Sequence, residues 1–403
     1  MKQERGFALV LVIALLGLLV LLCYALAALA KVDSQLAGTA VYQTQARQNA
    51  LLGLNVAIGE LQRHAGADDR ITGMAGITGA PGGANGRARH WCGVWTGTGA
   101  FLSWLASGAV DATIPNLTGT NAIALVSTGS LSSDVTNREH VWVVRSPVSV
   151  AGGDGTSLVL GNYAYWAGDE GVKLSLSVPD GDAVVAGTKH AITRHFTSIQ
   201  PTDANLLKLQ AYEQLTLPVF TTTALQPPGG FHSYTRAHYG LVAGVPKAGV
   251  LNVNSAGSRY WEGVAATYNQ LKPGGTGSIT PATFGNASNM SAPALWSGAS
   301  SGKMAAGPFI SIDGFLNNSR VISAITTGAT LLNFRITMQD WLAVRSDTFR
   351  IRAYGDAVNP ADSARVEAKA YCEAIVQRTP EALPGFGRRF VITYFRWLGP
   401  DDI

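Results

Sequence analysis

Charged side chains are scarce in this sequence. Asp, Glu, Lys and Arg make up 14% of the 403 residues, against about a quarter in a typical soluble domain. The net charge is only +4, and no block of Lys and Arg provides the basic patch of a nucleic-acid-binding surface. Apolar residues (47%) suffice for a sizeable core, and glycine is abundant at 46 residues. This balance favours loop-rich β structure in an extracytoplasmic protein, and we expect no nucleic-acid partner.

The sequence also lacks the usual signatures of catalysis. It has no phosphate-binding loop ending in Gly-Lys-Ser/Thr, no dinucleotide fingerprint and no His-Glu-x-x-His motif. A Gly-x-Ser-x-Gly spelling at residues 298–302 lies in a Ser/Gly-rich stretch, without the strand and helix that a nucleophile elbow needs. Adjacent Asp169 and Glu170 would point to opposite faces of a strand, so we predict a turn with a salt bridge to Lys173. We therefore expect no enzyme activity, no cofactor and no metal site.

Cysteine is almost absent, with three residues in the chain. Cys23 lies in an apolar run and is predicted to behave as a small hydrophobic residue in lipid. Cys92 and Cys372 either pair as a disulfide in an oxidising compartment or remain as buried free thiols. Two isolated cysteines do not make a zinc site. Histidines such as His232 and His238 lack a ligand motif, and we expect them to be satisfied or exposed.

The most apolar run lies at the N-terminus, over residues 7–30, and it contains no charged residue. As a helix rising 1.5 Å per residue, it spans roughly 36 Å, enough to cross a bilayer. Lys2 and Arg5 precede it, which by the positive-inside rule keeps the N-terminus in the cytoplasm. A cleaved secretory signal is the alternative, but its apolar region is shorter, about 7–15 residues. We predict a transmembrane helix whose membrane-anchor residues include Phe7, Leu11, Leu16, Leu22 and Ala30.

Helix-like patterning continues beyond this run, over residues 31–64. Apolar residues recur there at steps of three and four, and no proline interrupts residues 7–64. We therefore predict a single helix of about 58 residues, roughly 87 Å long. Its first half is expected to lie in lipid. Its second half is an amphipathic extension that is expected to pack on a soluble domain.

The residues Arg5-Gly6-Phe7 resemble the start of type IV pilins and pseudopilins, in which a short basic leader ending in glycine precedes such a helix. The resemblance implies that residues 1–6 are a prepilin-type leader. It also implies that a prepilin peptidase cuts between Gly6 and Phe7 and methylates the new N-terminus. The alternative is a single-pass anchor that is never processed.

Leu11 departs from the usual pilin pattern. Most pilins place Glu at this fifth mature position, where a costly charge in lipid is tolerated because it pairs with a neighbouring subunit's N-terminus. Large minor pseudopilins and some large minor pilins lack that Glu. The resemblance therefore implies a tip-like or minor subunit rather than a repeating shaft subunit.

Residues 65–403 are predicted to form an extracytoplasmic globular domain. Helical patches are expected at residues 101–106, 203–215 and around 340–342, and flexible loops near 73–89 and 274–307. Strand-like runs separated by Gly, Ser, Asn and Asp predict strands at 122–127, 140–147, 163–166, 172–178, 348–354, 364–378 and 389–397. Residues 141–144 and 390–395 are rich in β-branched and aromatic residues. The predicted fold class is α+β, with a long N-terminal transmembrane and amphipathic helix before a large, glycine-rich, mainly antiparallel β domain.

Segments of this domain extend the resemblance. Residues 163–173 look like an aromatic strand and Asp-Glu turn of large minor pseudopilins, and residues 349–378 resemble the hairpin that closes many pseudopilin domains. With residues 104–108 and 387–397, the pattern is similar to the Verru_Chthon cassette protein A family of large pilin-like proteins.

This resemblance implies a structural or assembly role, as a minor, tip-like subunit of a type IV pilus or a type II secretion-like pseudopilus. One span would hold the chain in the inner membrane, with its bulk periplasmic or extracellular. Other pilin-like subunits would contact its N-terminal helix. The alternative is a membrane-anchored extracytoplasmic adhesin or substrate-binding module.

Overall fold

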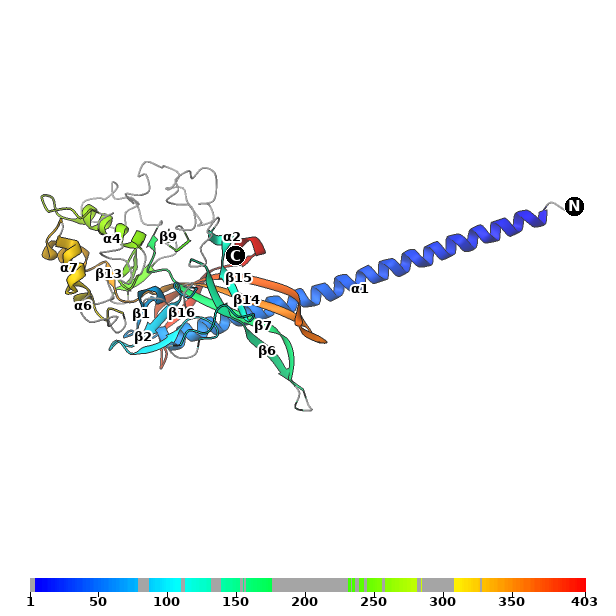
Figure 1. Ribbon diagram of the computed structural model, residues 1–403, viewed down its shortest axis with the longest axis horizontal. Coiled ribbons are helices and arrows are strands. Elements are labelled where there is room, and N and C mark those ends of the chain that lie inside the picture. The colour runs from blue at the N-terminus through cyan, green and yellow to red at the C-terminus, as the bar shows by residue number, and fades with distance from the viewer. Residues whose placement is uncertain are drawn as a thin grey trace.

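A long helix projects from a β-rich body in the computed structural model (Figure 1). This arrangement confirms the predicted α+β class, an apolar N-terminal helix followed by a mainly antiparallel β domain. The structure describes residues 4–78, 87–109, 113–131, 139–152, 155, 157–175, 231–232, 234–235, 239–242, 245–255, 258–280, 284, 308–326 and 328–403. The predicted helix at 203–215 therefore lies outside the described residues, as do His190, His195 and His238.

The helix α1 (Glu4–Ala65) runs without a break for 62 residues, as its patterning predicts. Its side chains stay largely exposed through residue 41, and Tyr42 is the first to pack against the body. The predicted packing of residues 31–64 is therefore correct only for the second part of that range. From there, small and apolar residues recur at steps of three and four and form the buried face: Ala46, Ala50, Leu54, Ala57, Leu61 and Ala65.

This face packs on a five-stranded antiparallel sheet with the strand order β16-β15-β14-β7-β6. The central strand β14 pairs with β15 from Thr348 opposite Gln377 onward, which confirms the predicted hairpin. On its other side, β14 pairs with β7, placing Arg352 opposite Trp166. The strands are β6 (Ser146–Ala151), β7 (Ser157–Asp169), β14 (Thr348–Asn359), β15 (Asp362–Leu383) and β16 (Gly387–Leu398).

The backbone of α1 touches the backbone of β14. A Cβ atom added at Gly355 would come within 2.1 Å of the Ala50 nitrogen and 2.3 Å of the Ala46 oxygen. The neighbouring strand residue also contributes, because the Asn49 amide donates to the carbonyl of Asp356 over 2.7 Å. A glycine at position 355 and small helix residues therefore fix where α1 lies on the sheet.

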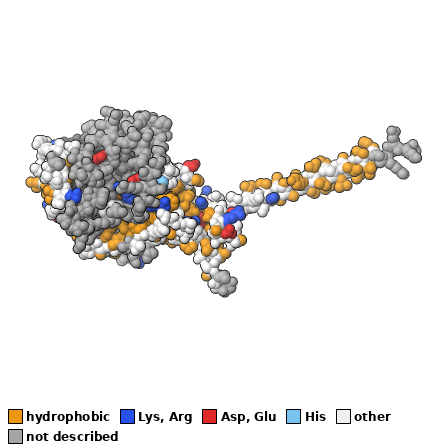
Figure 2. All heavy atoms as spheres, in the orientation of Figure 1, with side chains coloured by type: hydrophobic (Ala, Val, Ile, Leu, Met, Phe, Trp, Pro, Cys, Tyr) orange, Lys and Arg blue, Asp and Glu red, His pale blue; other side chains and the backbone are white. Residues whose placement is uncertain are grey.

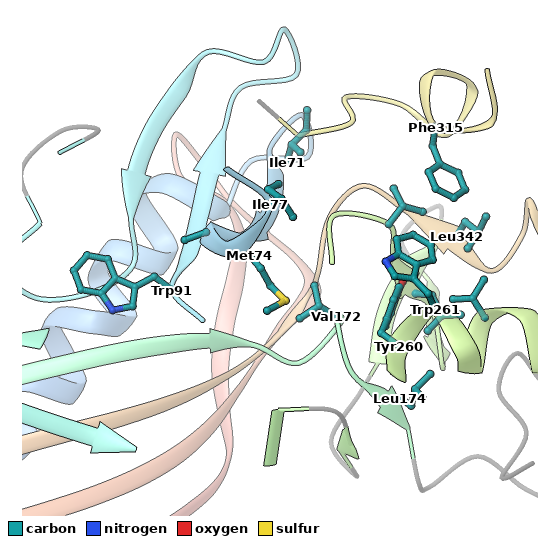
Figure 3. Close-up of a cluster of buried hydrophobic side chains, with 14 of the residues drawn as sticks. Ile71, Met74, Ile77, Trp91, Val172, Leu174, Tyr260, Trp261, Phe315 and Leu342 are labelled. Atoms are coloured by element: carbon teal, nitrogen blue, oxygen red, sulfur yellow. The ribbon is translucent and has the colours of Figure 1, made fainter. Parts of the chain in front are cut away.

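The opposite face of the sheet packs against a second, larger hydrophobic core. Tyr354 and Trp166 contribute from the sheet, and Trp261 stacks on Phe315 with ring centroids 5.6 Å apart. Figure 3 shows part of this core. Its helices are α4 (Ser258–Leu271), α6 (Ile312–Leu316), α7 (Ser319–Thr326) and α8 (Leu331–Met338).

Short sheets surround this core. The strands β1 (Ile71–Met74), β2 (Cys92–Trp95) and β3 (Phe101–Trp104) form a three-stranded sheet. Two antiparallel pairs are β4 (Ala122–Val126) with β5 (Val141–Val144), and β10 (Tyr239–Val242) with β11 (Val245–Ala248). Two parallel pairs are β8 (Leu174–Ser175) with β9 (Tyr234–Thr235), and β12 (Leu251–Asn252) with β13 (Leu342–Ala343). The remaining short helices are η1 (Ala75–Thr78), α2 (Thr128–Leu131) and η5 (Pro400–Asp402).

Several local predictions are wrong. Residues 101–106 are not helical, because β3 pairs there with β2 and packs Trp104 into the core. Residues 340–342 are a turn leading into β13 rather than a helix. Residues 73–78, predicted as a loop, complete β1 and form η1, because Met74 and Ile77 are buried. In the second predicted loop, Ile279 and Phe284 belong to the core, and residues 285–307 lie outside the description. Tertiary packing of apolar side chains overrides the local composition at these positions.

Candidate functional site: the exposed helix and the buried polar clusters

The projecting part of α1 has an apolar surface with no described neighbour (Figure 2). Residues 9–65 of α1 form one helix that is long and apolar enough to span a membrane, with a mean hydropathy of 3.1 in its most apolar window. The predicted anchor residues lie along it, and Phe7 is 73% exposed and Leu11 53% exposed. Leu16, Leu22 and Ala30 are also exposed. Apolar surface on this scale is stable when lipid or other helices cover it.

The predicted processing bond, between Gly6 and Phe7, lies in the first turns of α1, which begins at Glu4. The first four amide groups of a helix lack intrahelical acceptors. Helix ends therefore open at little cost in free energy. The predicted bond is thus at the end of α1 opposite the packed part, which starts near Tyr42.

A nearly uncharged stalk joins the predicted span to the body. Between Phe7 and Arg47 the only charged residues are Lys31 and Asp33. At 1.5 Å per residue, the ten or so residues between Lys31 and Tyr42 separate the body from the predicted span by roughly 15 Å along the helix axis. The body therefore has room for neighbouring helices beside the stalk.

Buried ion pairs hold the sheet to the loop after β7. Glu170 accepts from the Lys173 amine over 2.6 Å, which confirms the predicted pair. Arg350 lies between Glu170 (3.2 Å) and Glu373 (2.9 Å), and Glu373 also accepts from Arg352 over 2.9 Å. Burial opposes ionisation of Glu170, but the neighbouring Lys173 and Arg350 charges lower its pKa to about 2. These opposite charges compensate one another and bind the loop after β7 to the sheet.

Asp169 belongs to a different network from Glu170, as expected for adjacent strand residues. It accepts from the Thr72 hydroxyl over 3.1 Å and from the Gly171 amide over 2.8 Å, and Asn252 donates to it over 3.3 Å. Burial raises the pKa of Asp169 to about 6. Its hydrogen bonds join β1, β7 and β12, so the two carboxylates do not share a substrate site.

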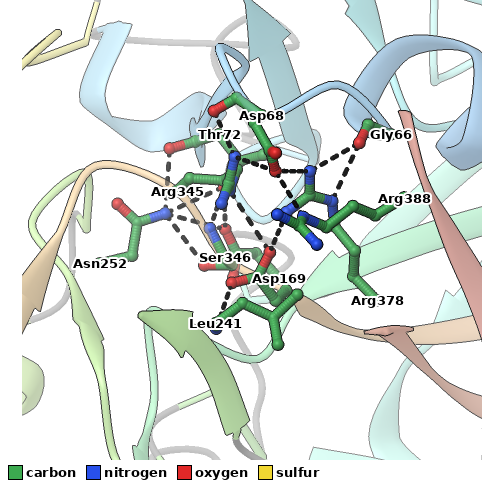
Figure 4. Close-up of polar contacts among 11 residues, drawn as sticks. Gly66, Asp68, Thr72, Asp169, Leu241, Asn252, Arg345, Ser346, Arg378 and Arg388 are labelled. Atoms are coloured by element: carbon green, nitrogen blue, oxygen red, sulfur yellow. Dashed lines mark hydrogen bonds and ion pairs between the residues drawn. The ribbon is translucent and has the colours of Figure 1, made fainter. Parts of the chain in front are cut away.

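A further polar network lies at the packed end of α1, around Arg378 and Asp68 (Figure 4). The guanidinium of Arg378, on β15, donates to the Gly66 carbonyl over 2.6 Å and pairs with Asp347 over 3.1 Å. Arg378 and Arg388 both pair with Asp68, and the hydrogen bond from Arg388 lowers the pKa of Asp68 to about 2. The chain leaving α1 is thus bound directly to β15 and β16.

Cys92 and Cys372 are both buried free thiols. They lie in the hydrophobic cluster between α1 and the sheet, and the Cys372 sulfur lies 4.0 Å from the Ala50 carbonyl. The disulfide alternative is thus not the one that the structure shows. Burial raises the pKa of both thiols, so they serve as small apolar residues of this interface.

Two histidines and a carboxylate form a cluster that the sequence did not predict. His90 Nε2 lies 2.8 Å from Glu139 Oε2, and His232 Nε2 lies 2.8 Å from the Glu139 carbonyl oxygen. The two imidazole rings are stacked, with centroids 3.5 Å apart. His90 and Glu139 are 49 positions apart in the chain, and Glu139 and His232 are 93 positions apart, so no local motif could reveal the cluster. In the part of the chain that the structure describes, this is the one His, Cys, Asp and Glu group with metal-ligand spacing.

Both histidines should make the fold sensitive to acid. Burial lowers the pKa of His90 and His232 below the usual 6.5, so the unfolded chain binds more protons as the pH falls. The contribution of these two histidines to the free energy of unfolding is fully present above about pH 6.5. Below that pH, the free energy of unfolding falls by up to about 1.4 kcal/mol per histidine for each pH unit.

A comparison of variants isolates this effect, because Asp169, with its raised pKa, acts in the opposite direction below pH 6. Thermal unfolding with a chelator present should show a smaller loss of stability between pH 7 and pH 5 in His232→Gln than in the unchanged protein. Equal losses in the two proteins would contradict the assignment.

No family model, curated protein or solved structure matches this chain. The exposed part of α1 is long and apolar enough to span a membrane. At the other end of α1, the Arg378 network binds the chain that leaves the helix to β15 and β16.

Proposed function

We propose that this protein is a minor, tip-like subunit of a type IV pilus or a type II secretion-like pseudopilus. In this proposal it is held in the inner membrane before assembly, with its bulk in the periplasm or outside the cell. The observation that carries the proposal is the form of α1. It is one continuous helix whose N-terminal part is apolar and exposed and whose C-terminal part packs on a β-sheet.

The rigid attachment of α1 supports assembly over simple anchoring. A flexible linker is enough to tether a binding module. Here the helix backbone contacts Gly355, Asn49 bonds to the sheet, and Arg378 binds the carbonyl at the end of the helix. Such a joint fixes the body relative to the helix axis, as a subunit placed by its helix in a filament requires.

Leu11 supports a position at the tip of the filament rather than in its repeating shaft. An acidic side chain in the membrane costs about 2.5–3.5 kcal/mol unless a partner compensates for it. Leu11 removes that cost and with it the attraction to a neighbouring N-terminus. The chain can therefore wait in the membrane alone and join a filament without the contact that repeating subunits make. A prepilin peptidase acting between Gly6 and Phe7 completes the proposal.

A photoreactive side chain at position 22 tests the proposed helix contacts. Leu22 is 59% exposed. Gly59 lies on the packed part of α1, where an added Cβ meets nothing within 4 Å, so a side chain there leaves the helix on the sheet. When the full chain is co-expressed with its neighbouring pilin-like proteins, position 22 should form crosslinks with their N-terminal helices, and position 59 should form far fewer. Crosslinks from position 22 to lipid alone would favour the anchored adhesin or substrate-binding module instead.

A further inference from the structure

Three chain segments that are distant in sequence meet at His90, Glu139 and His232. His90 lies just before β2, Glu139 just before β5, and His232 follows Phe231 in a short helical turn. Phe231 fixes that turn, because its ring packs against the cations of Lys173 (4.9 Å) and Arg352 (4.6 Å). All three side chains are thus held on anchored backbone.

The geometry brings three ligand groups, two imidazoles and one carboxylate, together. One ligand atom of each residue lies within 4.8 Å of the ligand atoms of the other two. Ligands around a tetrahedral zinc ion are about 3.3 Å apart, given bonds of about 2.0–2.1 Å. Since stacked rings direct their nitrogen lone pairs in parallel, one imidazole must turn about its Cβ–Cγ bond to share an ion with the other. The ligand atoms, which lie within 4.8 Å of one another, must also approach by up to about 1.5 Å to reach tetrahedral spacing.

The charged groups around Glu139 leave one of its carboxylate oxygens, Oε2, on the side of His90. Arg89 pairs with Glu139 Oε1 over 3.3 Å, which orients the group and leaves Oε2 facing His90. Such an outer contact is typical of metal-binding carboxylates. The nearby Lys173 amine pairs with Glu170 over 2.6 Å, outside the three-residue cluster. Beside the two imidazoles is a cavity of about 10 Å³, also lined by Asp169 and Lys173, with room for a single water.

We propose that His90, Glu139 and His232 form a binding site for a divalent transition metal of the zinc type. Two imidazoles and one carboxylate are a donor set that suits zinc, and a water completes four ligands. The ion would join the segments before β2 and β5 to the turn at residue 232. This inference goes beyond the proposed assembly role and does not depend on it.

Zinc binding by the full chain in detergent micelles tests the site. After treatment with a chelator, titration of zinc against a chromophoric competitor should show one equivalent bound. His232→Gln and Glu139→Gln should each lower the affinity at least tenfold. The matched control is His64→Gln, which removes a histidine that pairs with Glu60 on α1 and should leave the affinity unchanged.

Thermal unfolding separates a lost ligand from a lost fold. Added zinc should raise the unfolding temperature of the unchanged protein and of His64→Gln, but not that of His232→Gln, provided the variant unfolds cooperatively without metal. No stoichiometric binding, or equal binding by all four proteins, would overturn the proposal.

Discussion

Replacing Gly355 with alanine is expected to lower the free energy of unfolding by about 3 kcal/mol, at the upper end of the cost of overpacking. Alanine is by itself the better strand residue, by roughly 0.5–1 kcal/mol. At position 355 alanine destabilises the protein instead, because the new Cβ would lie 2.1 Å from the Ala50 nitrogen and 2.3 Å from the Ala46 oxygen. Backbone atoms cannot move aside like a flexible side chain, so α1 must shift away from the sheet.

Thermal unfolding of the full chain in detergent, with limited proteolysis of α1, measures this effect. The matched control is Gly59→Ala on α1 itself, where an added Cβ meets nothing within 4 Å. That change should stabilise the protein by roughly 0.5–1 kcal/mol. Equal responses at positions 355 and 59 would show that α1 does not lie directly on β14.

Replacing Glu373 with glutamine is expected to cost about 3–5 kcal/mol, because it leaves buried cations without their partner. The Glu373 carboxylate pairs with Arg350 and Arg352 over 2.9 Å each and with Arg396 over 3.1 Å. Burial disfavours its charge, but the three guanidinium groups hold the pKa of Glu373 well below its usual range. The carboxylate is therefore charged at neutral pH, and the amide cannot replace it.

Glu381→Gln on the same strand is the control for this change. Glu381 pairs with Arg389 at an exposed position, where both side chains are more than half accessible. Exposed pairs contribute about 0–1 kcal/mol. Unfolding by urea should therefore distinguish the two variants by at least about 2 kcal/mol. Similar values would mean that water reaches the Glu373 cluster.

The sequence predicts best where one segment carries its own pattern. The charge-free run from Phe7 and the three- and four-residue steps after it predict α1, and the structure has that helix. The hairpin of β14 and β15 agrees with the two strands predicted at 348–354 and 364–378, on either side of a turn. The pair of Glu170 with Lys173 was predictable for the same reason, since it lies within one turn.

The sequence predicts poorly where distant segments decide the outcome. Gly355 looks like any glycine in a strand, and only its contact with Ala50 makes it essential. Met74 and Ile77 lie in a stretch of Gly and Ala, and burial against other elements turns them into ordered structure. His90 and His232 meet only in the folded chain, because their separation leaves no spacing to recognise.

The mature N-terminus is the most direct test of the proposed role. The full chain would be co-expressed with a prepilin peptidase, purified from the membrane and analysed by mass spectrometry. The account predicts loss of residues 1–6 and an N-terminal methylated Phe7, with no processing in Gly6→Leu. An intact Met1, or cleavage near Ala30, would contradict it.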